Sequence, residues 1–159
     1  MSQLNHNEKQ LSDDHCIQRC IELAKIAFDN GNTPVGSIVV LGDTIIAEGI
    51  ETLPTSSDVT GHAELIAVQK AVYESKNGSL HGTTLYSTAE PCFMCSYVIR
   101  NAEISRVVFC LDTPLIGGVT SDYPILTDSR LNNWKPSPQI ERGILAQRFT
   151  TTKEKWQAV

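Results

Sequence analysis

Two short motifs contain the residue types that bind metal ions. The stretch TAEPCFMC, residues 88–95, places the thiols of Cys92 and Cys95 three residues apart. Such a pair can form or exchange a disulfide, make half of a structural zinc site, or hold a catalytic metal. The stretch HAE, residues 62–64, adds the imidazole of His62. Together these groups are three zinc ligands with the fourth position left open, as in hydrolytic zinc sites.

Glu64 is the reactive group that this ligand set does not use. It is too close to His62 in the sequence to be an obvious fourth ligand. Zinc lowers the pKa of a bound water toward neutrality, and a carboxylate beside the metal can carry protons from that water to a substrate. The motifs therefore favour hydrolysis at an electrophilic carbon over a redox pair or a closed structural site.

Each motif stands at the start of a predicted helix. Apolar residues recur at helical spacing through residues 61–75 and 91–101, and Pro91 is typical of a first helical turn. Residues two apart on a helix point about 200° away from each other, so His62 and Glu64 can share a site only at a helix end. The N-terminus of a helix also lowers the pKa of nearby thiols. We therefore expect two helix starts to converge on one metal ion.

The remaining elements predict a layered α/β domain around these helices. Their order is helix, hairpin, helix, strand, helix, strand, which is typical of helices packed on a mixed sheet. The helices are expected at residues 12–29, 61–75, 91–101 and 144–156, and the strands at 37–41, 44–50, 83–88, 106–111 and 139–142. Residues 113–138 contain four prolines and a Gly-Gly pair, so we expect a pocket wall or an interface there and not regular structure.

Composition indicates one domain over residues 1–159, with residues 1–11 flexible. The chain is 41% hydrophobic and 19% charged, which suits a single buried core. Its formal charge of −5 does not favour contact with phosphate backbones, so nucleic acid is not the expected partner. An odd number of cysteines, a polar N-terminus and the lack of long apolar runs predict a cytoplasmic protein that is not bound to membranes.

The two motifs together resemble the signature of the zinc-dependent cytidine deaminase superfamily. The resemblance extends to residues 32–36, the hairpin and the strand at 106–109, so it covers most of the chain. A histidine as first ligand is most similar to the branch with bacterial guanine deaminases, fungal cytosine deaminases and tRNA adenosine deaminases. The resemblance implies a three-layer α-β-α fold, a homodimer, and one Zn²⁺ per chain held by His62, Cys92 and Cys95.

The resemblance also implies a reaction, that of a zinc-dependent aminohydrolase. Water adds to the amino-bearing carbon of a nucleobase, Glu64 protonates the ring nitrogen and then the leaving amine, and ammonia departs. The backbone amides of Ala63 and Cys92 and the carbonyl of Glu90 are expected to line the reacting centre. In this family aromatic groups near the C-terminus often stack on the base, which makes Trp156 a candidate substrate-binding residue.

Trp134 is a second candidate for such stacking, and either tryptophan could equally cover the core. Three other residues suggest a second metal site, namely His15, Cys16 and Cys20. Cys20 falls on the buried face of the first predicted helix, where a free cysteine is an ordinary core residue. Packing is likewise the simplest interpretation of Cys110.

Glu51 departs from the pattern of this branch, whose members usually carry an asparagine eleven residues before the zinc histidine. An amide both donates and accepts hydrogen bonds, whereas an ionised carboxylate only accepts. We therefore expect the substrate to present donors to Glu51, such as the ring N–H and amino group of a guanine-like edge. If the loop after the second strand is displaced by one residue, Thr52 and not Glu51 faces the substrate.

The leading hypothesis is an enzyme that deaminates a free nucleobase or nucleoside, guanine-like in preference to cytosine-like. One alternative is a tRNA adenosine deaminase, which should carry a basic terminal helix. Residues 150–159 contain only Lys153 and Lys155, separated by Glu154, and give this alternative little support. Another alternative is a zinc-binding partner subunit without catalysis, which should have lost Glu64.

Overall fold

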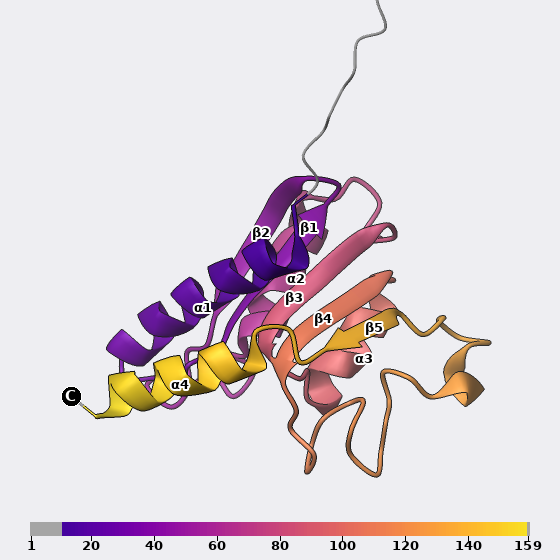
Figure 1. The fold of residues 1–159 in the computed structure, drawn as a ribbon. Coiled ribbons are helices and arrows are strands. Elements are labelled where there is room, and N and C mark those ends of the chain that lie inside the picture. The colour runs from indigo at the N-terminus through magenta and orange to yellow at the C-terminus, as the bar shows by residue number, and fades with distance from the viewer. Residues whose placement is uncertain (1–10, 159) are drawn as a thin grey trace, which may run out of the picture.

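A five-stranded mixed sheet forms the middle layer of the computed structural model, which describes residues 11–158 (Figure 1). In space the strands follow the order β2-β1-β3-β4-β5. β1 is antiparallel to β2 and β3, while β3, β4 and β5 are parallel. The strands are β1 (Gly36–Leu41), β2 (Thr44–Ile50), β3 (Thr83–Ala89), β4 (Arg106–Leu111) and β5 (Gln139–Arg142).

Helices cover both faces of this sheet. α1 (Asp13–Asp29) and α4 (Ala146–Gln157) lie on one face, and α2 (Ala63–Glu74) and α3 (Phe93–Asn101) lie on the other (Figure 1). Successive residues of β4 alternate between the two resulting cores, because side chains alternate across a strand. Every residue from Val107 to Cys110 is therefore buried. The three-layer α-β-α fold class is confirmed.

The sheet topology brings the two motifs to one edge. Because β1 is antiparallel to both β2 and β3, these two strands run in the same direction and end at the same edge of the sheet. The chain that leaves β2 reaches the start of α2 at His62, and the chain that leaves β3 reaches the start of α3 at Cys92. Motifs far apart in the sequence therefore lie side by side.

Gly49 in β2 permits the close approach of α2. A Cβ atom added at Gly49 would lie 2.1 Å from the carbonyl oxygen of Ala63, the first residue of that helix. Any side chain at this position would push the start of α2 away from the sheet. The packing of β2 against α2 thus fixes the start of α2 at Ala63, and with it the position of the N-cap residue His62.

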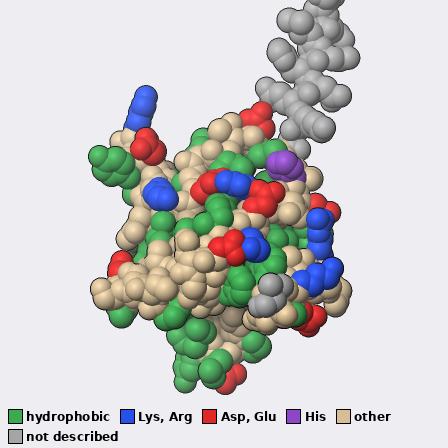
Figure 2. Space-filling view, turned by 90° about the vertical axis from the view of Figure 1, so that its left-hand side faces the viewer, with side chains coloured by type: hydrophobic (Ala, Val, Ile, Leu, Met, Phe, Trp, Pro, Cys, Tyr) green, Lys and Arg blue, Asp and Glu red, His purple; other side chains and the backbone are tan. Residues whose placement is uncertain are grey.

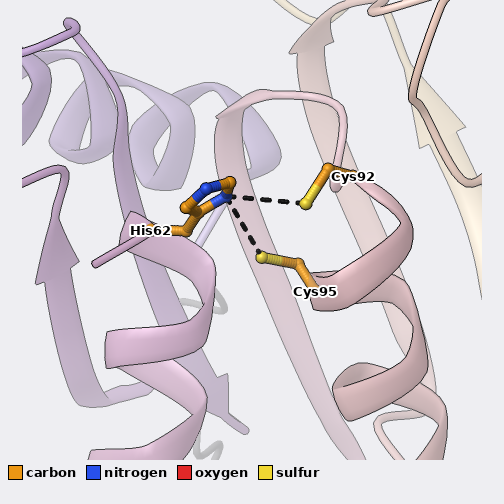
Figure 3. Close-up of side chains that lie close together, drawn as sticks. All are labelled: His62, Cys92 and Cys95. Carbon is orange, nitrogen blue, oxygen red and sulfur yellow. Dashed lines mark hydrogen bonds between the residues drawn. The ribbon is translucent and has the colours of Figure 1, made fainter. Parts of the chain in front are cut away.

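The predicted elements agree with the structure to within one residue, except at the starts of three helices. One of these is α4, which is predicted from residue 144 and begins at Ala146. Ser12 caps α1 by accepting a hydrogen bond from the His15 N–H at 3.2 Å, and the strands at 44–50, 106–111 and 139–142 have the predicted bounds. The helices predicted at 61–75 and 91–101 instead begin at Ala63 and Phe93. His62 and Cys92 are the N-cap residues of these helices and have an extended backbone, and their side chains point toward each other (Figure 3).

The segment of residues 113–138 is irregular, as predicted, apart from a short 3-10 helix, η1 (Ser129–Leu131). Residues 1–10 of the segment predicted to be flexible lie outside the described residues, and Leu11 packs against the core beneath α1. Among residues 11–158, no helix has the length and apolar character needed to cross a membrane.

Candidate active site

The three predicted zinc ligands meet at the starts of α2 and α3 (Figure 3). The Nδ1 atom of His62 lies 3.5 Å from the Sγ atom of Cys92 and 3.7 Å from the Sγ atom of Cys95. Zn–N and Zn–S bonds of about 2.05 and 2.3 Å at tetrahedral angles place such donors about 3.6 Å apart. The separations therefore fit one tetrahedral zinc ion bound by these three side chains.

The first turn of α3 prepares its thiols for a metal. The pKa of Cys92 is lowered to about 5, first by the hydrogen bond from the Cys95 thiol and then by the backbone N–H groups of Cys95 and Met94. The lowered pKa favours the thiolate form of Cys92. The thiolate is the form that binds zinc.

Glu64 lies beside the ligands with its side chain buried. Its Oε1 atom accepts a hydrogen bond from the Ser87 hydroxyl at 2.9 Å, and its Oε2 atom lies 3.9 Å from the Sγ atom of Cys95. The residue is only 4% exposed, and burial raises the pKa of its carboxyl to about 7, helped by the negative charges of Cys92 and Glu51. A carboxyl group with a pKa near neutrality can both take up and release a proton.

Ser87 was missed by the sequence reasoning. It lies in β3, faces inward and is fully buried. The alternation of β3 indicates an inward position, but its pairing with Glu64 depends on how α2 packs over the strand. No motif in the sequence predicts the contact between Ser87 and Glu64.

A cavity of about 290 Å³ opens over the zinc ligands. This volume is at the small end of ligand pockets, which hold about 300–1,000 Å³, and it suits one flat ring system. The charged and metal-binding groups in its wall are Glu51, His62, Glu64, Glu90 and Cys92. Its other lining residues are Thr33, Val35, Leu53, Ala89, Thr113 and Ile116.

Glu51 lies in the wall of this cavity, whereas Thr52 turns away and donates its hydroxyl to the Gly61 carbonyl at 3.1 Å. The predicted position of Glu51 relative to His62 thus holds in the structure. One carboxylate oxygen of Glu51 accepts the backbone N–H of Ala63 at 3.2 Å. Burial raises the pKa of this carboxyl. The predicted roles of Glu51 and Ala63 in substrate binding stay predictions.

Glu90 has a second role that sequence reasoning did not find. Its carbonyl oxygen accepts a hydrogen bond from the Thr113 hydroxyl at 3.3 Å. Its carboxylate accepts the backbone N–H groups of Thr113, Val119 and Thr120 at 2.7 to 2.8 Å, and the Thr120 hydroxyl at 2.6 Å. Burial raises the pKa of this carboxyl, but the hydrogen bonds outweigh it and the pKa is lowered. The charged side chain of Glu90 therefore organises the start of the 113–138 segment.

Neither tryptophan is among the residues that line this cavity, and the expected role of Trp156 in substrate binding stays a prediction. The ring of Trp156 packs against Phe28 and Phe149, with centroids 5.8 and 6.2 Å away, because α4 lies over the end of α1. Trp134 stacks on Tyr97 at 5.2 Å. Both rings are engaged with other aromatic groups of the described chain.

The second metal site is not formed in the described part of the chain. The groups of potential metal ligands found between residues 11 and 158 both include His62 and belong to the site at the helix starts. Cys16 and Cys20 are fully buried in the core beneath α1, and Cys110 is also buried. Packing is therefore the role of these three cysteines, as the simpler interpretation predicted.

The chain is similar to known deaminases. Residues 11–111 match a family model described as the cytidine and deoxycytidylate deaminase zinc-binding region. A tRNA-specific adenosine deaminase of Streptococcus pyogenes serotype M1 is 37% identical over 130 residues, covering 82% of this chain and 74% of the relative. The enzyme of the same name from Aquifex aeolicus (strain VF5) is 34% identical over 139 residues, with coverage of 86% and 92%.

Two solved structures extend this similarity. One belongs to biochemical and structural studies of A-to-I editing by tRNA:A34 deaminases at the wobble position of transfer RNA. It has a TM-score of 0.78 and 26% identity, and the match covers 86% of this chain and 97% of the other. A guanine deaminase from Bacillus subtilis has a TM-score of 0.61 and 32% identity, with coverage of 64% and 66%.

These relatives correct two expectations. The prediction of a free guanine-like base as the main substrate is wrong, and so is the prediction that nucleic acid is an unlikely partner, because the relatives matched over most of both chains are tRNA-specific. The net charge of −5 is a sum over the whole chain and does not describe the surface around the site. Glu51 is a single contact and cannot decide between a free base and the same kind of base within an RNA.

Proposed function

We propose that this chain, which belongs to the zinc-dependent cytidine deaminase superfamily, deaminates adenosine to inosine in tRNA. The observation that carries the proposal is the similarity to tRNA-specific adenosine deaminases over most of both chains. The wobble position of the anticodon is the proposed target, since a structural relative was studied for editing there. A complete set of ligands together with Glu64 argues against a partner subunit without catalysis.

The residues at the helix starts are suited to this reaction. His62, Cys92 and Cys95 would hold the zinc ion, which when bound would supply a water molecule of lowered pKa. Glu64 takes a proton from this water and passes it to the ring nitrogen beside the amino-bearing carbon. It then carries the second proton of the water to the leaving amino group. The reaction consumes one water and releases ammonia, and the ring carbon becomes a carbonyl.

Ser87 acts as a positioning residue. Its hydroxyl donates to one oxygen of Glu64 and leaves the other oxygen facing the Cys95 side of the site. This contact restricts rotation of the Glu64 carboxyl, so that the same oxygen can serve both proton transfers. Held in this way, Glu64 needs little rearrangement during the reaction.

The size of the cavity fits a base that enters alone. A space of about 290 Å³ accepts a ring system, so the ribose, the phosphates and the neighbouring nucleotides must stay outside. A single-stranded anticodon loop can present such a base, because its bases unstack at a low cost. We infer that the target base is turned out of the loop and inserted between Glu51 and the zinc ligands.

Glu51 is the proposed contact for the edge of the base. Its carboxylate oxygens only accept hydrogen bonds, and one of them already accepts the Ala63 N–H. Exchange of Glu51 for asparagine adds a donor, so the ratio of kcat/KM for stem-loops with adenosine or cytidine at the target position should change about five-fold, the effect of one hydrogen bond. An unchanged ratio would count against this contact.

Self-association and the cytoplasmic location remain predictions. Exposed aromatic residues on the α2–α3 side, Tyr73 and Tyr97, offer a surface on which two copies could pack. Sedimentation of the purified protein distinguishes a dimer from a monomer. A monomer at micromolar concentration would contradict the predicted homodimer.

The proposed function is tested with the zinc-loaded protein and a tRNA anticodon stem-loop that carries adenosine at the wobble position. We expect inosine in the product, measured by mass spectrometry of the digested RNA, and little release of ammonia from free guanine or cytosine. Glu64→Ala is the control, and it should keep zinc but form no inosine. A zinc-loaded wild-type protein that leaves the stem-loop unchanged would overturn the proposal.

A further inference from the structure

A second cavity is formed between the start of α3 and the 113–138 segment. It has a volume of about 420 Å³. Phe93 in its wall directly follows the ligand Cys92 and donates its backbone N–H to the carbonyl of Ile116 at 3.1 Å, while Ile116 lines the first cavity. The second cavity is lined by Phe93, Asp122, Tyr123, Pro124, Ile125, Asp128 and Arg130.

Two aromatic rings meet in this cavity. The centroids of Phe93 and Tyr123 are 6.0 Å apart, and their planes are nearly perpendicular at 87°. The edge-to-face contact holds the rings in a defined orientation. Tyr123 is 71% exposed, so most of its ring is open to a partner. An exposed ring of this kind can stack on a nucleobase of any identity, because every base has a flat π face.

The segment that carries Tyr123 is held firmly. Arg100 of α3 is fully buried, and its Nη1 atom donates to the carbonyl oxygens of Ile125 at 2.8 Å and Asp128 at 3.0 Å. Leu126 is also fully buried, and its backbone N–H donates to the Gly118 carbonyl at 2.8 Å. A site fixed in advance loses less conformational entropy when a ligand binds.

The charges of the cavity favour a base over a phosphate as the occupant. Arg130 is exposed, but its guanidinium is paired with Asp128, with Nη2 and Oδ2 2.6 Å apart. Asp122 adds a further carboxylate to the wall. One cation against two carboxylates does not attract an anion, so recognition must come mainly from the aromatic rings and the apolar atoms of Pro124 and Ile125.

The apolar character of this region extends to the molecular surface. In the space-filling view, hydrophobic side chains gather at the lower end of the molecule, where the 113–138 segment lies in the ribbon view (Figure 2). Leu115, Ile116 and Tyr123 of that segment are exposed large hydrophobic residues. Of these residues, Ile116 lines the zinc cavity and Tyr123 lines the second cavity.

We propose that the second cavity binds a nucleobase adjacent to the target adenosine, stacked on the ring of Tyr123. The inference rests on the proposed function, because a neighbouring base is present only when the substrate is an RNA. The target base occupies the small cavity over the zinc ligands, and the chain of the loop passes over Phe93. The next base then meets Tyr123, and its stacking helps to keep the target base turned out of the loop.

The experiment measures kcat/KM for inosine formation with Tyr123→Ala and Tyr123→Phe. Three stem-loops are used: one intact, one with an abasic residue on the 5′ side of the target, and one with an abasic residue on its 3′ side. With the intact loop, Tyr123→Ala should lower kcat/KM about ten- to a hundred-fold, the range for loss of one stacked base. Tyr123→Phe should retain nearly the full value, because it keeps the ring.

The abasic loops separate stacking from a structural effect. On the loop that lacks the stacked base, wild type and Tyr123→Ala should have the same kcat/KM, since the partner of the ring is gone. Zinc content and thermal unfolding of both variants should match those of the wild type. These results would also tell on which side of the target the base lies.

The inference and the proposed function fail in different ways. A wild-type protein that forms no inosine from any stem-loop overturns the proposed function, and the inference with it. An active wild type with an equally active Tyr123→Ala variant overturns the inference alone. So does a Tyr123→Ala defect of equal size on all three loops, because the loss would then not depend on a neighbouring base.

Discussion

The carboxylate of Glu90 accepts the backbone N–H of Thr120 at 2.7 Å, which ties the residue before the Pro-Cys motif to the segment that walls the site. Gly117 allows this contact, because a Cβ atom there would lie 2.2 Å from the Glu90 carboxylate. The same segment meets Cys92 through a β-bridge at Gly117. The metal-ligand turn and the pocket wall are therefore built as one unit.

Exchange of Glu90 for glutamine should loosen this unit. The amide presents one acceptor oxygen where the carboxylate has two, so buried N–H groups of the segment lose their partners. We expect the free energy of unfolding in urea to fall by about 1–3 kcal/mol. The Glu90→Gln variant should also lose its zinc at a lower chelator concentration than the wild type does.

Glu141→Gln is the matched control, since Glu141 is exposed in β5. It should leave both unfolding and zinc retention unchanged. A Glu90→Gln variant as stable as this control would show that the hydrogen bonds to the segment contribute little.

Removal of the carboxyl of Glu64 should stop proton transfer without releasing the metal. Glu64→Gln keeps the size and the contact with Ser87, so zinc content should stay at one ion per chain. We expect kcat for inosine formation to fall about 10²- to 10⁴-fold, the usual contribution of a positioned acid and base. Retention of most of the activity by this variant would remove Glu64 from the mechanism.

Ser87→Ala should lower kcat and leave KM nearly unchanged, because the hydroxyl orients Glu64 and does not line the cavity. The expected decrease is about ten-fold, which corresponds to one hydrogen bond to a charged group. Steady-state kinetics on the stem-loop separates the two parameters. A rise in KM with unchanged kcat would argue for a role in binding and not in positioning.

Loss of a thiol ligand should abolish zinc binding. Cys92→Ser replaces a thiolate of low pKa with a hydroxyl that does not ionise near neutrality, and the purified variant should contain well under one zinc ion per chain by atomic absorption. Cys110→Ala is the control, since Cys110 is a buried cysteine outside the site, and it should keep its zinc. Equal zinc content in both variants would contradict the assigned ligand set.

The ion pair at the start of α1 should make stability depend on pH. Arg106 donates to both carboxylate oxygens of Asp13, at 2.8 and 2.6 Å, and these hydrogen bonds hold the pKa of Asp13 below its ordinary value. A carboxyl with a lowered folded pKa stabilises the fold above its unfolded pKa of about 3.9, and this contribution is lost as the pH falls through the folded value. Asp13→Asn should therefore cost about 1 kcal/mol at pH 7 and progressively less below about pH 4.

Asp14→Asn is the control for this measurement. Asp14 also lies in the first turn of α1 but is exposed, so it shares the favourable interaction with the helix dipole and lacks the contact with Arg106. Urea unfolding from pH 3 to 7 compares the two variants. A difference between wild type and Asp13→Asn that does not change with pH would contradict the role of the ion pair.

The metal ligands could be predicted because each motif is recognisable by its residue types and spacing, although the sheet topology is what brings His62 to Cys92 and Cys95. Cys92 and Cys95 share one helix start, and His62 stands at the start of another. The roles of Ser87 and the Glu90 carboxylate could not be predicted in this way. They depend on which strand residue lies beneath α2 and on where a long irregular segment returns to the site.

The substrate was predicted wrongly because it depends on what surrounds the cavity. Glu51 was correctly placed in the wall, but a single acceptor does not reveal whether a base arrives free or attached to an RNA. The total charge averages over all surfaces of the molecule. The contact of Trp156 with Phe28 could not be predicted either, since the packing of α4 on α1 is set by tertiary contacts.

The close approach at Gly49 makes the chemistry sensitive to a residue that takes no part in it. An alanine there would add one carbon atom, and that atom would collide with the Ala63 carbonyl, beside the imidazole that holds the metal. Gly49 has no side chain and therefore no group that could act as an acid, a base or a hydrogen-bond donor. A random mutagenesis screen for lost activity should nevertheless select against nearly every change at this position, as it would for a catalytic residue.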